Sequence, residues 1–90
     1  MKLYTLITIY HHDKTNPMNP LVKVHLSTTD DKLAKANYER MVAHEVHKGM
    51  APTKKSAGYQ VDLEDDTSSM TIALNLTTEN MEFTFGRSQW

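Results

Sequence analysis

Ninety residues suffice for one domain with a modest core, because a chain of this length buries only about two thirds of the surface that its unfolded form exposes. The composition, 39% hydrophobic and 23% charged, is too apolar for a disordered chain and too polar for a membrane protein. The net charge of −1 conceals an uneven distribution: residues 1–58 carry nine basic and five acidic side chains, and residues 59–90 carry one and six. Such an asymmetry bears on binding partners more than on fold.

The sequence contains no cysteine, which excludes disulfides, thiol catalysis and cysteine-ligated zinc or iron–sulfur sites. No apolar run approaches the roughly 18 residues of a transmembrane helix. The apolar N-terminal stretch lacks the small-residue cleavage site of a signal peptide. We therefore expect a single cytoplasmic domain that spans residues 1–90.

The N-terminal third predicts two strands joined by a polar loop. Residues 2–10 alternate with apolar side chains on both faces, which favours a central strand. One face would carry Leu3, Thr5, Ile7 and Ile9, and the other Tyr4, Leu6, Thr8 and Tyr10. Residues 11–20 contain two Asn-Pro steps and predict a loop. In residues 21–28 the pattern places Val22, Val24 and Leu26 inward and Lys23, His25 and Ser27 outward, as is typical of an edge strand.

A helix is predicted next. Thr29, Asp30 and Asp31 supply an N-cap and favourable charge for its first turn, and the helix should continue to about Lys48 and end at Gly49. At 100° per residue its apolar stripe comprises Leu33, Ala34, Tyr38, Met41 and Val42.

The last third predicts three strands, at residues 59–64, 70–76 and 81–85, separated by turn-forming residues. The fold class is therefore α+β, with element order β-β-α-β-β-β and a single helix packed on one face of a five-stranded antiparallel sheet. A helical crossover over the first strand suggests that the strands lie in the order 21–28, 2–10, 59–64, 70–76, 81–85. The sheet face opposite the helix would then be open.

That open face is the predicted binding site. On this interpretation Tyr4, Leu6 and Tyr10 form an exposed apolar strip bordered by carboxylates, and such strips mark interaction surfaces. The carboxylates are Asp62, Glu64, Asp65, Asp66 and Glu82. They predict a protein partner with a basic surface, with solubility as the plain alternative. Phosphate backbones require Lys and Arg, so nucleic acid is not expected on this face.

Two other functions remain open. A nucleic-acid-binding module would use a basic patch on the helix and the connector after it, comprising Arg40, His44, His47, Lys48, Lys54 and Lys55. A structural homodimer would form through the open sheet face or through edge strand 21–28. His44 and His47 have a spacing that can chelate a metal, but Arg40 lies one turn earlier on the same face, and we expect no metal and no cofactor.

We expect no catalysis either. No serine lies in a nucleophile-elbow context, and three glycines in the whole chain leave no phosphate-binding loop. The sequence therefore predicts a small non-catalytic accessory or inhibitor-type protein, of the kind that phages and mobile elements encode.

Overall fold

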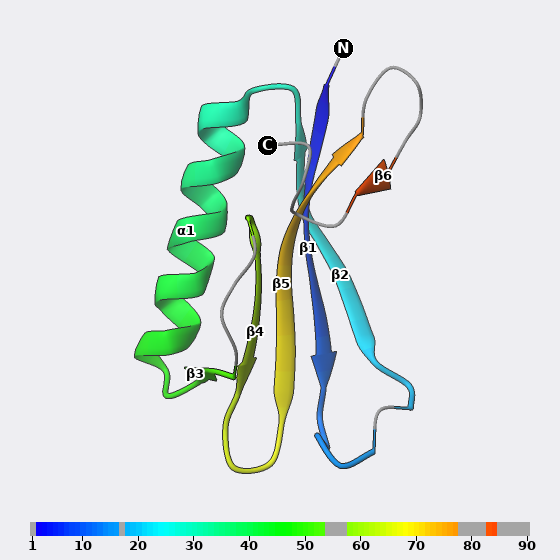
Figure 1. Ribbon diagram of the computed structural model, residues 1–90, viewed down its shortest axis with the longest axis vertical. Helices are drawn as coiled ribbons and strands as arrows, with labels where there is room; N and C mark the ends of the chain where they lie inside the picture. Colours follow the sequence, from blue (N-terminus) through cyan, green and yellow to red (C-terminus); the bar gives the residue numbers. More distant parts are fainter. Residues whose placement is uncertain (1, 17, 54–57, 78–82, 85–90) are drawn as a thin grey trace.

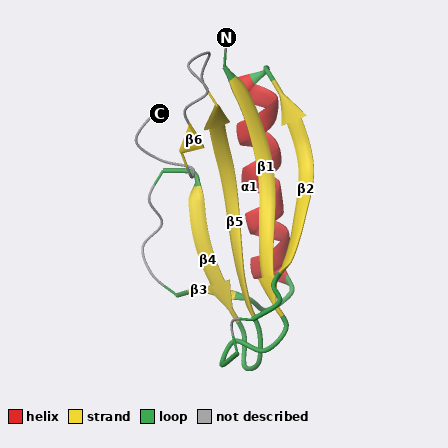
Figure 2. Ribbon diagram, turned by 90° about the vertical axis from the view of Figure 1, so that its right-hand side faces the viewer, coloured by secondary structure: helices red, strands yellow, loops and turns green. Residues whose placement is uncertain are grey.

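The computed structural model describes residues 2–16, 18–53, 58–77 and 83–84 (Figure 1). The elements follow the order β1 (Leu3–His11), β2 (Leu21–Thr28), α1 (Asp31–His47), β3 (Ala51–Pro52), β4 (Gln60–Glu64), β5 (Ser69–Thr77) and β6 (Phe83–Thr84). All strand pairs are antiparallel, and α1 lies against one face of the sheet (Figure 2). This confirms the predicted α+β fold with a single helix on an antiparallel sheet.

The predicted order of the strands is wrong in one respect. The observed order is β2-β1-β5-β4-β3, with β6 paired to β5 beyond the end of β4. Strand β5, rather than β4, is therefore the neighbour of β1. The nine residues of β5 match those of β1 along its whole length, from Leu3 opposite Thr77 to His11 opposite Ser69, whereas β4 has only five residues. The crossover preference gave no guidance, because it concerns parallel strands, whereas the predicted strands before and after the helix correspond to β2 and β4, which run in opposite directions.

Helix α1 begins and ends where its capping residues predict. The Asp30 carboxylate accepts hydrogen bonds from the backbone N–H groups of Lys32 and Leu33, at 3.0 and 3.2 Å. Lys48 is the C-cap, and Gly49 follows with φ +111°, a conformation that glycine adopts without strain. The buried residues of the helix are Ala34 and Tyr38, and Met41 and Val42 pack against the same core.

The core fills the space between α1 and the sheet. Its fully buried strand side chains are Leu6, Leu63, Ile72, Leu74 and Leu76, and Tyr4, Val61 and Met50 complete it. The predicted face of β1 is therefore wrong: Tyr4 and Leu6 lie beneath the helix, with 6% and 1% of their surface exposed. Both faces of β1 are apolar, so alternation alone did not choose between them. The pairing with β5 decides which face is covered, because Leu6 lies opposite Leu74, whose side chain is fully buried in the core.

Strand β2 contains a bulge that changes which side chains face the helix. Leu6 pairs with Leu26, but the next residue of β1, Ile7, pairs with Val24, so His25 is the additional residue. Leu26 packs against the core as predicted. Val22 and Val24 instead lie on the opposite face, with 55% and 65% of their surface exposed. A bulge breaks the strict alternation on which their predicted inward position depended.

Candidate binding surfaces

The sheet face opposite α1, here called the outer face, is apolar at one end and acidic at the other. Cross-strand register places Val22, Ile9, Thr71 and Asp62 in one row across four strands. Neighbouring strands are about 4.8 Å apart, so about 14 Å separates the valine from the carboxylate. In the middle of this face Ala73 and Asn75 are fully buried, and the Asn75 amide has no hydrogen-bond partner among the described residues. The exposed apolar surface is thus concentrated at the β2 end.

The predicted acidic residues lie together at the β4 end of the sheet, but most of them already have partners. Thr71 donates a hydrogen bond of 2.7 Å to the carboxylate of Asp62. Glu64 forms an ion pair with Lys14, with 3.6 Å between Nζ and Oε2. Asp66 is exposed, and Glu82 lies outside the described residues. A hollow of about 400 Å³ is lined by Asp62, Glu64 and Thr71, among others.

Asp65 has a local structural role. Its Oδ1 accepts hydrogen bonds from the backbone N–H groups of Thr67 and Ser68 and from the Ser68 hydroxyl, at 3.0, 2.8 and 2.9 Å. These bonds close the turn between β4 and β5. They favour the ionised form, and together with Lys14 they hold the pKa of the Asp65 carboxyl below its usual value. The spacing of Asp65 and Ser68 is a turn signal that the sequence already contains.

The predicted aromatic anchors are not exposed on the outer face. Tyr4 and Leu6 belong to the core, so a partner would reach them only by displacing α1. Tyr10 is half-buried and also lies on the helix side, where it lines a pocket. The most exposed apolar side chains of the outer face are instead Val22 and Val24, which sequence alternation had placed inside.

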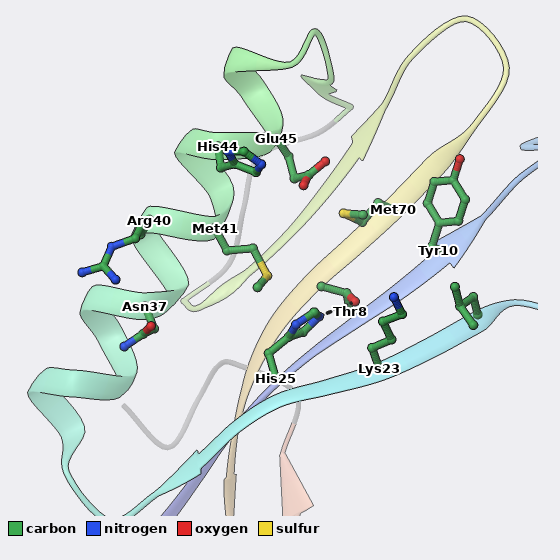
Figure 3. A pocket seen from close by; sticks show the side chains of 11 residues that line it. Thr8, Tyr10, Lys23, His25, Asn37, Arg40, Met41, His44, Glu45 and Met70 are labelled. Atoms are coloured by element: carbon green, nitrogen blue, oxygen red, sulfur yellow. Dashed lines mark hydrogen bonds between the residues drawn. The ribbon is translucent and has the colours of Figure 1, made fainter.

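The predicted basic patch is divided. Arg40 and His44 line the pocket between α1 and the sheet, together with Lys23 and His25 from β2 (Figure 3). His47 and Lys48 are exposed at the end of the helix, and Lys48 lies 3.7 Å from Glu45. Lys54 and Lys55 lie outside the described residues. A nucleic-acid interface across helix and connector stays a prediction.

The pocket occupies about 520 Å³ beside the C-terminal half of α1. Its helix wall comprises Asn37, Arg40, Met41, His44 and Glu45, and its sheet wall comprises Thr8, Tyr10, Leu21, Lys23, His25 and Met70. The bulged His25 turns toward the helix, and its Nε2 lies 2.9 Å from the Thr8 hydroxyl (Figure 3). Sequence reasoning did not place Lys23, His25 and Thr8 in one pocket with Arg40, because a bulge leaves no clear sequence signal.

Within the described part of the chain, no group of three or more His, Asp or Glu side chains is arranged to hold a metal ion. No helix there is both long and apolar enough to cross a membrane. Comparisons with protein-family models, with curated protein sequences and with solved structures find no match to this chain. Its function therefore has to be argued from its own surfaces.

Proposed function

We propose that this chain is a small non-catalytic protein-binding domain, of the accessory or inhibitor type, whose outer face contacts a partner with a basic surface. One observation carries the proposal: the described strand residues of the outer face include the carboxylates of Asp62 and Glu64 and no Lys or Arg, while Val22 and Val24 stand exposed at the opposite end of the same face. Protein interfaces combine an apolar core with a polar rim, and charges of opposite sign on the two partners guide their association.

The two ends of the outer face have different roles in this proposal. Burial of the valines against the partner removes apolar surface from water. Each Å² buried contributes about 25 cal/mol of favourable binding free energy. The carboxylates attract cationic side chains, which accelerates association and orients the partner. The hollow beside Asp62 and Glu64 has room for the end of a lysine or arginine side chain. Val22 and Val24 thus take the role that the sequence had suggested for Tyr4 and Leu6.

The acidic half of the surface is tested by the double substitution Glu64→Gln and Asp66→Asn. It removes two charges but leaves Asp62 and Asp65, whose hydrogen bonds hold β4 and β5 in place. In a pull-down from extract of the source cell, followed by mass spectrometry, wild type should recover a basic protein at low salt that the double variant does not. The matched control is Asp31→Asn with Glu39→Gln, which removes two charges from exposed positions of α1. Equal recovery by wild type and the Glu64/Asp66 variant would contradict the proposal.

A second copy of the chain is the second candidate occupant, because Val22 and Val24 lie on the strand that ends the sheet. A two-fold axis beside β2 would bring the valines of two copies together and keep their carboxylates apart. In that case the mass measured by sedimentation equilibrium rises with concentration, and Val24→Asp abolishes the rise while Glu64→Gln does not. A wild-type mass that stays monomeric up to millimolar concentration excludes the homodimer.

A further inference from the structure

The pocket beside α1 exists because the helix packs tightly against the sheet at one end only. In its N-terminal half, Ala34 and Tyr38 are buried against the core. In its C-terminal half the residues that face the sheet are Met41, His44 and Glu45, of which none is fully buried (Figure 3). On the sheet side the fully buried Leu6 is followed by the small polar Thr8. The space between the layers therefore stays open there, at about 520 Å³, within the range of small-molecule sites.

The charged groups around this pocket favour an anion. Lys23 extends from β2 beside the pocket, and Arg40 lies at its outer rim on α1, turned away from the sheet (Figure 3). Neither cation has an ion-pair partner among the described residues. The carboxylate of Glu45 also points toward the sheet, but Lys48 lies 3.7 Å from it. The imidazoles of His25 and His44 add hydrogen-bonding groups. The pocket thus combines two cations that have no ion-pair partner among the described residues with a carboxylate that pairs with Lys48.

The remaining lining is apolar and adaptable. Met41 extends from the helix toward the sheet, and Met70 and Tyr10 lie on the sheet wall opposite (Figure 3). Leu21, with 53% of its surface exposed, forms part of the rim. Methionine side chains have several rotatable bonds and a polarisable sulfur, so they fit varied apolar and aromatic shapes. A free inorganic ion would leave this surface unused.

We propose that this pocket binds a small organic anion, a carboxylate or phosphate monoester with an apolar or aromatic body. The acid group lies between Lys23 and Arg40, whose guanidinium swings inward from the rim to pair with it, and the body packs against Met41, Met70 and Tyr10. Arginine pairs with carboxylate and phosphate oxygens through two parallel hydrogen bonds, which suits it to either group. This site is on the opposite side of the sheet from the outer face and is independent of the proposed protein partner.

The test compares matched probes by nuclear magnetic resonance of the ¹⁵N-labelled chain. 4-tert-Butylbenzoate and 4-tert-butylphenyl phosphate carry the anion, and 4-tert-butylbenzyl alcohol has the same body without charge. Both anions should shift the amide signals of Thr8, His25, Met41 and Met70 and bind about tenfold tighter than the alcohol, because hydrogen bonds to charged groups are the stronger ones. The ratio of the two anion affinities shows whether the site prefers carboxylate or phosphate.

Two double variants locate the source of this preference. Lys23→Met with Arg40→Met should bind all three probes equally and weakly. Lys2→Met with Lys32→Met removes the same charge from exposed positions outside the pocket and should keep the tenfold preference. The proposal is overturned if the alcohol binds wild type as tightly as the anions do, if the Lys23/Arg40 variant keeps the preference, or if the shifted signals belong to Val22 and Val24 on the outer face.

Discussion

Replacing Leu6 by aspartate is expected to unfold the domain. Leu6 has 1% of its surface exposed and lies between Leu26 on β2 and Leu74 on β5, beneath α1. Loss of a buried leucine side chain costs about 2–5 kcal/mol. A carboxylate without a partner in the same place adds several kcal/mol. The total of more than about 5 kcal/mol is comparable with the whole stability of a small domain, about 5–15 kcal/mol. Circular dichroism and urea denaturation measure the effect.

The matched control introduces the same charge on the other side of the sheet. Val24 has 65% of its surface exposed, so Val24→Asp should change the free energy of unfolding by less than about 0.5 kcal/mol. Sequence alternation had predicted the reverse, with Leu6 exposed and Val24 inside. A Leu6→Asp protein with the spectrum and urea midpoint of wild type would show that β1 presents its other face to the helix.

The parts of the fold that depend on local interactions were predicted from the sequence. The helix is the clearest case: the Asp30 carboxylate caps the N–H groups of the first turn, and Gly49 adopts a positive φ just after the C-cap. Both effects act within a few residues, so they can be recognised without knowledge of the tertiary structure. The strands 59–64 and 70–76 were placed correctly to within about one residue for the same reason, since the turn held by Asp65 separates them.

The predictions that were wrong concern features that depend on contacts between segments distant in the sequence. The covered face of β1 is set by its pairing with β5, some 65 residues later, and both faces of β1 are apolar enough to pack. The neighbour of β1 is decided by matching strand lengths across the sheet. The pocket depends on the bulge at His25 and on how the helix is placed over Thr8. Neither can be recognised from residue types or their spacing. For the same reason the candidate site changed: Asp62 and Glu64 lie on the outer face, but Tyr4 and Leu6 do not, and the most exposed apolar side chains of that face are Val22 and Val24 at its other end.

The second large effect on stability is expected at Tyr38, because its side chain connects the helix to the residue just before β4. Its ring meets that of Tyr59 edge to face, with centroids 5.4 Å apart and an interplanar angle of 75°. The carbonyl of Tyr59 in turn accepts a 2.8 Å hydrogen bond from the N–H of Leu74 in β5. Tyr38 itself has 7% of its surface exposed. Tyr38→Ala should therefore lower the free energy of unfolding by about 3–5 kcal/mol, measured by urea denaturation at pH 7.

The variant Tyr38→Phe separates the ring from its hydroxyl. Burial raises the pKa of the Tyr38 phenol from 10.0 to about 12, with Tyr59 and Glu39 adding to the effect. The folded state therefore keeps the phenol proton at pH values where the unfolded state has released it. This contribution to stability is complete below pH 10 and is lost as the pH rises toward 12. Wild type should lose more stability than Tyr38→Phe over this interval, while at pH 7 the Phe variant stays far closer to wild type than the Ala variant. Parallel losses in the two proteins between pH 10 and 12 would show that the phenol ionises as readily in the folded state as in the unfolded one.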